Sequence, residues 1–488
     1  MGRAHRTPKD ISYADTFRNN PDNDKMTPRI FIMVLAVGVM VFAGIVSETA
    51  MNVASATLME EFSIGTAQVQ WVTTAYILVI TCVIPITSYL SKAISDRQNF
   101  LLATVTFLIG CVVCFAAVNF PMLILGRVIA GVGSGIAIPL MFNIILAYVP
   151  FRMQGTILGV GNIICSISPA FGPSIAGAVI TYSSWRYIFI FLIVLVVISM
   201  LMGLFSIPGN RIAVRPAFDR SGYILLCVVF ATIILGAGLS GTCGWLSVPV
   251  PGCFAAAVIF ALLFYRHYKR CDAPIISIRI FRSLPFLCAA LAILLIQFDS
   301  LSQGVLIPEY SQLVNGNTTA VAGLLIVPGS VLCAILMPVS GRIYDKRGPR
   351  IPFTIGGAGL IIGTGIGMVL GMRLDSGSMV FLYLLYGIGL GMIISCLQGA
   401  GFHSLPKELS ADGTAMFSTM QQLGGALGTA VISFVIGAAQ TAQPDDMAYA
   451  TACGSRSGYI LLFVLACVVA LCLCVILRSL RKKYTPAA

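Results

Sequence analysis

Fourteen runs of about 20 predominantly apolar residues, separated by short polar breaks, organise the chain. A helix of about 20 residues crosses the hydrocarbon core of a bilayer, whereas barrel strands are about ten residues long with alternating polarity. The pattern therefore predicts an all-α integral membrane protein with 14 transmembrane helices. The runs begin near Ile30, Trp71, Phe100, Pro121, Met153, Tyr187, Gly222, Leu246, Leu284, Thr319, Ile351, Met379, Gly413 and Gly458.

The composition indicates that the solvent of this chain is mostly lipid. Of its 488 residues, 58% are hydrophobic and 10% are charged, against about 25% charged residues in an ordinary soluble domain. This balance excludes a soluble enzyme, a disordered protein and a secreted disulfide scaffold. No nucleotide-binding loop of the P-loop type occurs, so we expect no ATP and no cofactor. His5, His267 and His403 lie in expected tails or loops and form no metal-ligand pattern.

The basic residues predict the orientation in the membrane. Of the 30 lysines and arginines, 26 lie on the side that carries the termini, and only Arg186, Arg373 and Arg456 lie on the other. Because lysine and arginine accumulate in cytoplasmic loops, both termini are expected in the cytoplasm. The net charge of +12 is then a topology signal, and nucleic acid is not an expected partner.

A polar motif after the second span is repeated after the tenth. Five pairs align at one offset of 253 residues: Pro85 with Pro338, Ser88 with Gly341, Lys92 with Asp345, Ser95 with Gly348, and Arg97 with Arg350. The offset exceeds the length of one six-helix half, so the seventh and eighth spans are predicted to be an insert. The predicted segments are a cytoplasmic tail (1–29), an N-terminal six-helix half (30–206), a two-helix insert with cytoplasmic linkers (207–283), a C-terminal six-helix half (284–479) and a cytoplasmic tail (480–488).

Several motifs carry a resemblance to the major facilitator superfamily. Gly341-Arg-Ile-Tyr-Asp345-Lys-Arg-Gly348-Pro-Arg350 resembles its GxLxDRxGRR loop, and Leu125-Gly-Arg127-Val-Ile-Ala-Gly131 resembles its RxxQG motif. The stretch from Gly161 to Gly177, with Pro169, Gly172 and Pro173, is similar to its antiporter motif. Three further stretches are similar to the fourteen-helix drug:proton antiporters of the EmrB and QacA type: Ser47 to Ala54, Trp71 to Tyr76, and Ser184-Trp185-Arg186. The resemblance implies a major-facilitator fold of six, two and six helices.

The first copy of the loop departs from the family pattern. Lys92 stands where the family has an aspartate, Ser95 stands for its glycine, and Ala130 replaces the glutamine of RxxQG. The resemblance therefore implies that the second copy, with Gly341, Asp345, Gly348 and Arg350, is the intact cytoplasmic gate loop. Asp345 is expected near the N-terminus of the eleventh span, where the helix dipole favours an anion, with Lys346, Arg347 and Arg350 as partners. Such a cluster either latches two helices in one state or anchors the loop to anionic headgroups.

Two acidic residues lie deep in apolar runs, one in the first span of each half. A carboxylate in the hydrocarbon costs at least about 2.5 kcal/mol, so Glu48 and Asp299 are functional candidates. Desolvation favours the neutral form of a carboxyl group, and such a group binds and releases protons as its hydration changes. The alternative is a protonated carboxyl group that serves packing alone. We expect both residues to take part in proton coupling.

Other candidates follow from the same spans. Arg127 is the only basic residue deep in a span, so it should pair with an acidic residue or with backbone carbonyl groups. Arg127 either takes part in proton coupling, which the resemblance implies, or has a fixed structural role. Pro169 and Pro173 should kink the fifth span, while Gly161, Gly172 and Gly177 let it approach its neighbours closely. Candidate groups of the substrate cavity are Asn52, Tyr76, Gln303 and Tyr310.

The functional hypothesis is a secondary transporter in the plasma membrane of a bacterium. It would export amphipathic or cationic drugs and toxic compounds in exchange for protons, by rocking of two halves around a midplane cavity. The expected partners are a small-molecule substrate, protons and the lipid bilayer, and a periplasmic adaptor is left open. The alternatives are export of a native metabolite, lipid or peptide, and a membrane sensor that transports nothing.

Overall fold

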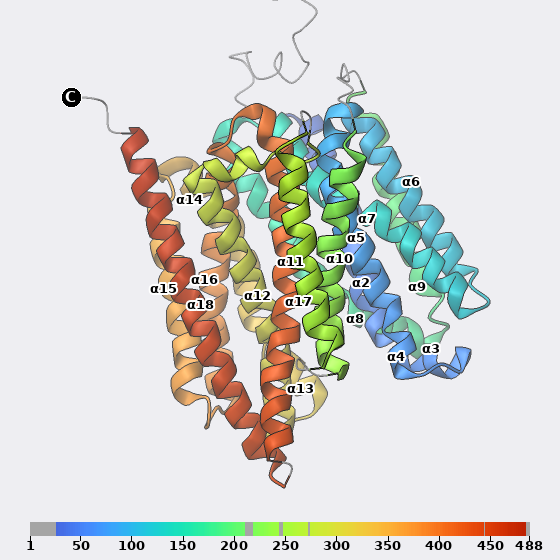
Figure 1. Cartoon of the computed structure of the whole chain (residues 1–488), viewed down its shortest axis with the longest axis vertical. Helices are drawn as coiled ribbons and strands as arrows, with labels where there is room; N and C mark the ends of the chain where they lie inside the picture. The colour runs from blue at the N-terminus through green and yellow to red at the C-terminus, as the bar shows by residue number, and fades with distance from the viewer. Residues whose placement is uncertain (1–25, 210–217, 244–246, 272–273, 444, 485–488) are drawn as a thin grey trace, which may run out of the picture.

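The computed structural model describes residues 26–209, 218–243, 247–271, 274–443 and 445–484. These residues form a bundle of long helices that run roughly parallel to one another (Figure 1). Fourteen helical segments are long and apolar enough to cross a membrane, which confirms the predicted number of spans. Because that number is even, the start of the first span and the end of the last lie at the same end of the bundle, here called the terminal face.

The N-terminal half contains six spans with short helices between them. Its spans are α2 (Pro28–Val53), α5 (Trp71–Ala93), α6 (Asp96–Phe115), α7 (Phe120–Tyr148), α8 (Gln154–Tyr182) and α9 (Tyr187–Ser206). The short helices are α3 (Ser55–Phe62), α4 (Thr66–Val69) and η2 (Phe151–Met153). Local capping sets several of these ends. At the start of α6, for example, Ser95 and Gln98 satisfy each other's backbone amides in a capping box.

The remaining segments are an inserted hairpin and a second set of six spans. The hairpin consists of α10 (Arg220–Cys243) and α11 (Pro249–Tyr268), followed by η3 (Ile278–Arg282). The second set consists of α12 (Leu284–Leu313), α13 (Thr319–Leu324) with α14 (Val327–Arg347), α15 (Arg350–Leu370), α16 (Ser376–His403), η4 (Lys407–Leu409), α17 (Ser410–Ala442) and α18 (Met447–Tyr484).

The helix contacts repeat between the halves. In the first half α2 packs against α8 and α9, and α5 and α6 both pack against α7. In the second half α12 packs against α17 and α18, and α14 and α15 both pack against α16. The halves meet through α8 against α14 and α5 against α17, so the second helix of each half contacts the fifth of the other. The sequence repeat therefore corresponds to a repeat of packing.

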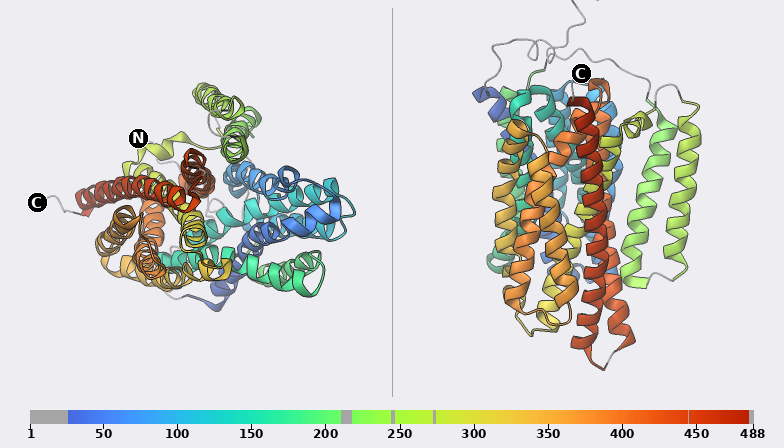
Figure 2. Two further views of the ribbon diagram at one scale, coloured as in Figure 1. Left: turned by 90° about the horizontal axis from the view of Figure 1, so that it is seen from below. Right: turned by 90° about the vertical axis from the view of Figure 1, so that its left-hand side faces the viewer.

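The inserted hairpin lies at the periphery of the bundle (Figure 2). α10 contacts α5 and α17, one helix from each half, and α11 packs on α10. Most of α11 is exposed, with Val258, Ile259 and Leu262 turned outward, as expected for a helix that faces lipid.

The last span begins earlier than the hydrophobic pattern predicts. The apolar run starts near Gly458, but α18 begins at Met447. Asp446 accepts a hydrogen bond from the Tyr449 amide at 2.9 Å, which satisfies a free donor of the first turn. Hydropathy locates the apolar part of a helix, whereas such capping contacts locate its end.

Candidate functional site

The first acidic candidate, Glu48, lies in α2 beside a guanidinium group from α7. Arg127 is fully buried, and its Nε atom donates a hydrogen bond to the carbonyl oxygen of Val72 at 3.0 Å. Its Nη1 atom donates to the carbonyl oxygen of Ser47 at 3.1 Å and to the Ser47 hydroxyl at 2.7 Å. Backbone carbonyl groups, one of the two expected kinds of partner, thus hold Arg127 and tie α7 to α2 and α5. Glu48 follows Ser47 directly and lies in the electrostatic field of this guanidinium.

Tyr76 covers Arg127 from α5. The guanidinium carbon of Arg127 lies 3.9 Å from the centre of the Tyr76 ring, a cation–π contact. The Tyr76 hydroxyl donates a hydrogen bond to the carbonyl oxygen of Gly44 at 2.8 Å. The Nη2 atom of Arg127 is buried and has no hydrogen-bond partner in the described part of the chain. One guanidinium donor is therefore still unsatisfied at the residue that neighbours Glu48.

The second acidic candidate, Asp299, lies in α12 in a different environment. Its side chain is buried, and its Oδ1 atom has no hydrogen-bond partner among the described residues. Gln303, one turn further along α12, is fully buried, and neither polar atom of its side chain is satisfied by a described group. Tyr386 of α16 and Tyr459 of α18 interact electrostatically with Asp299, and their buried hydroxyl groups are likewise unpartnered in the described structure. Asp299, Gln303, Tyr386 and Tyr459 thus leave hydrogen-bonding capacity unused inside the C-terminal half.

Two of the four expected cavity residues lie beside the acidic residues, and two do not. Tyr76 belongs to the Arg127 site and Gln303 to the Asp299 site. Asn52 is exposed near the end of α2, where its Oδ1 atom accepts a hydrogen bond from Thr73 at 2.7 Å. Tyr310 is buried, but its hydroxyl accepts a hydrogen bond from the Leu374 amide at 3.1 Å. It holds the loop before α16, about 16 Å along α12 from Asp299.

The glycines of the fifth span, α8, differ in how closely they approach neighbouring helices. Both Pro169 and Pro173 lie inside this continuous helix. Gly172 contacts α2 so closely that a Cβ atom would meet the Thr49 hydroxyl and lie 2.9 Å from the Ala50 amide. Gly161 faces Met141 of α7. Gly177 has no neighbour within 4 Å, so the prediction of a close contact there is wrong. Gly177 lies in the last turns of α8 and faces open space, although its neighbour Ala176 is buried.

Asp345 joins the two halves at the terminal face. Its Oδ1 atom accepts a hydrogen bond from the Gly155 amide, and its Oδ2 atom accepts one from the Thr156 amide, both at 2.9 Å. The Thr156 hydroxyl donates a further bond to Oδ2 at 2.8 Å. The expected helix partner is therefore wrong: Asp345 caps the N-terminus of α8 in the other half, rather than that of α15. A carboxylate at a helix N-terminus is favoured by the helix dipole.

The rest of the second loop copy supports this contact. Gly341 packs so closely on Gly155 that a Cβ atom would collide with the Gly155 backbone. Gly348 ends α14 with φ of 77°, a backbone conformation that favours glycine. Arg350, with Lys346 and Arg347, is exposed rather than turned toward Asp345. The basic residues of this motif are thus available to lipid headgroups, while its acid holds α8.

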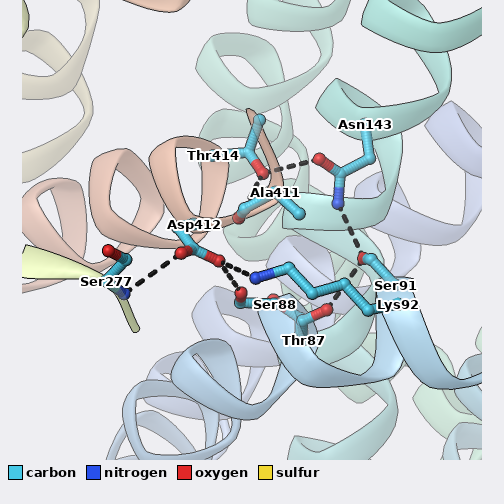
Figure 3. Close-up of polar contacts among 9 residues, drawn as sticks. All are labelled: Thr87, Ser88, Ser91, Lys92, Asn143, Ser277, Ala411, Asp412 and Thr414. Atoms are coloured by element: carbon cyan, nitrogen blue, oxygen red, sulfur yellow. Dashed lines mark hydrogen bonds and ion pairs between the residues drawn. The ribbon is translucent and has the colours of Figure 1, made fainter. Parts of the chain in front are cut away.

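The first loop copy also joins the halves, and it does so through Lys92, which stands where the family has an aspartate. The Lys92 Nζ atom lies 2.6 Å from Asp412 Oδ1, and Ser88 donates a hydrogen bond to the same oxygen (Figure 3). The other carboxylate oxygen of Asp412 accepts a hydrogen bond from the Ser277 amide at 3.1 Å. Asp412 lies in the first turn of α17, and its side chain is 1% exposed. One buried carboxylate therefore connects α5, α17 and the segment that precedes η3.

Further polar contacts cross between the halves close to these two. Thr414 of α17 donates a hydrogen bond to Asn143 of α7 at 2.6 Å, and Asn143 in turn donates to Ser91 at 3.0 Å (Figure 3). Asn162 of α8 donates to the Gln398 side chain of α16 at 2.7 Å. These contacts hold the halves together at and below the terminal face.

At the opposite face, several polar contacts join parts of one half. Trp185 donates a hydrogen bond to Glu61 at 2.5 Å, and Arg186 forms an ion pair with Glu61 at 2.7 Å, all within the N-terminal half. Partial desolvation raises the pKa of Glu61, but the hydrogen bonds from Arg186 and Trp185 lower it and keep it below its ordinary value. Asn315 donates to the Leu374 carbonyl at 3.0 Å within the C-terminal half. The chain is thus latched at the terminal face.

Sequence reasoning missed several residues of these sites, among them Asp412, Tyr386 and Tyr459. Asp412 carries a signal that could have been used, because an acidic residue in the first turn of a helix is a common capping position. Tyr386 and Tyr459 lie in apolar runs of the sequence, and only the fold shows that they interact electrostatically with Asp299.

Comparisons with known proteins agree with this architecture. Residues 35–429 match the Major Facilitator Superfamily. The chain is 30% identical over 447 residues to the lincomycin resistance protein LmrB of Listeria monocytogenes, covering 88% of this chain and 93% of that protein. It is 27% identical over 414 residues to the multidrug resistance protein B homolog of Mycobacterium tuberculosis, covering 83% and 76%.

A solved structure shows the same fold at low sequence identity. The human organic anion transporter MFSD10 (TETRAN) superposes with a TM-score of 0.61 at 13% identity, covering 90% of this chain and all of that one. With its bacterial relatives and its 14 spans, the chain is a multi-pass protein of the bacterial plasma membrane. It belongs to the Major Facilitator Superfamily, whose members are transporters and not enzymes.

Proposed function

We propose that this transporter exports amphipathic, often cationic compounds in exchange for protons. One observation carries the proposal: the first helix of each half holds an acidic residue, Glu48 or Asp299, next to buried polar groups with unused hydrogen bonds. Charged groups are excluded from hydrocarbon unless a function retains them. The names of the bacterial relatives support drugs as the substrate class.

Asp299 is suited to carry a proton. A buried carboxylate with an unsatisfied oxygen, here Oδ1, is costly, so the geometry of this site favours the protonated form while the site is closed to water. The unused groups of Gln303, Tyr386 and Tyr459 can hold water when the site opens. Hydration would then stabilise the carboxylate, and the proton would leave.

Glu48 is suited to exchange a proton for a cation. Its neighbour Arg127 retains one unsatisfied donor, Nη2, so an ionised Glu48 has a partner within the N-terminal half. A cationic compound that approaches Glu48 would stabilise the carboxylate further and prevent it from holding a proton. Binding of the substrate and binding of the proton therefore exclude each other, which makes exchange obligatory.

Alternating access would follow from breaking the contacts at the terminal face. The Asp345 contact with α8 and the Lys92–Asp412 pair hold the two halves together there. Rocking of the halves would separate these groups and expose a midplane cavity to the expected cytoplasmic side. The proton gradient suffices as the energy source, since about 2.3 kcal/mol per 100 mV and about 1.4 kcal/mol per pH unit are available.

The proposal is tested in inside-out vesicles whose lumenal pH is followed while candidate compounds are added. A panel that includes lincomycin, lipophilic cations and neutral metabolites separates drug export from export of a native metabolite, lipid or peptide. Proton movement that depends on a cationic drug supports the proposal. Proton movement with a metabolite alone favours the second candidate, and no response to any compound favours a sensor.

A further inference from the structure

We infer that the inserted hairpin carries a binding site for a divalent transition metal of the zinc type. Asp219, His267 and Cys271 each offer one ligand atom, and these atoms all lie within 4.8 Å of one another. Asp219 directly precedes α10, whereas His267 lies in the last turn of α11 and Cys271 follows it. The site would join the two ends of the hairpin at the terminal face.

The local fold places His267 and Cys271 on one side of the helix end. Positions four residues apart in a helix lie one above the other on the same face. The chain keeps a helical turn beyond α11, since the Cys271 amide donates a hydrogen bond to the Tyr268 carbonyl oxygen at 3.4 Å. The sequence-based assignment of His267 to a loop is therefore wrong, because His267 lies in the last turn of α11. The missing signal was the spacing of His267 and Cys271 opposite the start of α10.

Asp219 supplies a buried carboxylate that its protein contacts do not satisfy. Its side chain is 4% exposed, and its Oδ1 atom accepts a hydrogen bond from the Gly222 amide at 2.8 Å. The same oxygen lies 2.7 Å from His267 Nε2. Its Oδ2 atom is buried and has no hydrogen-bond partner in the described part of the chain. Because a Cβ atom at residue 222 would collide with Oδ2, glycine there provides the room for this oxygen.

The charges around the site are compatible with a cation. The basic residues of the same segment, Arg266, Lys269 and Arg270, are exposed, whereas His267 and Cys271 are half-buried. Lys269 lies over the ring of Tyr265, with its Nζ atom 4.6 Å from the ring centre. A thiolate and a carboxylate together carry two negative charges, which a divalent ion neutralises.

The ligand types select the class of metal. Thiolate and imidazole suit zinc and its chemical relatives, whereas calcium and magnesium prefer oxygen ligands alone. Three protein ligands leave a fourth tetrahedral position for water or another small ligand. Such an ion would fix the start of α10 to the end of α11, independently of what the transporter carries.

The experiment uses cobalt(II) as a spectroscopic probe on the full-length protein, purified in detergent and freed of metal with a chelator. A thiolate ligand to cobalt gives a charge-transfer band in the near ultraviolet, and added zinc should remove it. We expect one cobalt ion per chain with this band. The variant Cys271→Ser should lose the band and bind cobalt at least about tenfold more weakly, since even outer-shell changes cost roughly 10–100-fold. Cys253→Ser, within α11 and beside Gly236 of α10, should keep both.

The variant Asp219→Asn separates loss of metal binding from loss of folding, because asparagine caps a helix as well as aspartate does. It should elute as a folded protein on gel filtration and yet bind cobalt more weakly. The absence of a charge-transfer band in the wild type, or an unchanged band in Cys271→Ser, would overturn the inference. Unchanged cobalt affinity in Asp219→Asn would remove Asp219 from the site.

Discussion

The Nζ atom of Lys92 lies 2.6 Å from the Oδ1 atom of Asp412, and this ion pair joins the end of α5 to the first turn of α17 across the two halves. In the repeated motif, the position of Lys92 corresponds to that of Asp345. Asp345 contacts the N-terminus of α8, so both copies of the motif reach the fifth helix of the other half. In the second copy the motif supplies the acid, Asp345. In the first copy the motif supplies the base, Lys92, and α17 supplies the acid, Asp412.

The Lys92–Asp412 pair predicts what happens when its charges are reversed. Lys92→Glu places two acids together and should shift the protein toward the state that is open at the terminal face. Adding Asp412→Lys should restore the pair only in part, because lysine cannot accept the hydrogen bond from the Ser277 amide. The Lys92 side chain is 35% exposed, so solvent screens the pair in part and we expect a coupling of about 1 kcal/mol.

Distances between spin labels at Phe205 and Ile355, which are exposed on different halves, report the opening. Arg282→Glu, a charge reversal of an exposed residue of η3, serves as the control. Equal label distances in Lys92→Glu and in the control would show that the Lys92–Asp412 pair does not hold the halves together.

The glycines of α8 predict a contrast between two equivalent substitutions. Gly172→Ala should lower the free energy of unfolding by about 1–3 kcal/mol, because the new methyl group meets Thr49 and the Ala50 backbone. Gly177→Ala should leave it unchanged or raise it by up to about 1 kcal/mol, since alanine favours the helix and nothing lies within 4 Å. Thermal unfolding in detergent measures both. Equal effects of the two substitutions would contradict the packing described for α8.

The contacts of Arg127 predict that lysine cannot replace it. An ammonium group cannot reach the Val72 carbonyl and both acceptors of Ser47 with the fixed geometry of a guanidinium. Arg127→Lys should lower stability by about 1–3 kcal/mol, the cost of unsatisfied buried acceptors, and should impair transport. Arg456→Lys, at an exposed arginine, is the matched control. Wild-type stability and transport in Arg127→Lys would show that only the positive charge of Arg127 is needed.

The pKa of Glu61 predicts a local response to acid at the face opposite the termini. Because the folded-state pKa lies below the ordinary value of 4.5, the ion pair stabilises the fold above about pH 4.5 and loses this effect as the pH falls through the folded-state pKa. Tryptophan emission from Trp185, with Trp71 and Trp245 replaced by phenylalanine, should change over that range. In Glu61→Gln the same transition should be absent, and its persistence would assign it to another group.

Sequence patterns predicted the number of spans, the repeat and the inserted hairpin, because apolar length and charge are local properties of the chain. They failed where the answer depends on a partner distant in sequence. Asp345 caps α8 and not the helix that follows it, and Lys92 finds Asp412 some 320 residues away. Asp299 was predicted from its depth in an apolar run, but its tyrosine neighbours come from two other helices. Pairing across the halves is determined by the packing of helices, which periodicity alone does not specify.

The exchange of a proton for a cationic compound through Glu48 and Asp299 is tested most directly in proteoliposomes that report lumenal pH. An imposed pH gradient should drive uptake of a fluorescent lipophilic cation by the wild-type protein, and adding the cation should move protons in the opposite direction. Glu48→Gln and Asp299→Asn should each abolish this coupled movement while inserting normally, and Glu60→Gln, at an exposed residue outside the spans, should not. Unaltered pH-driven transport in both acid variants would contradict the account.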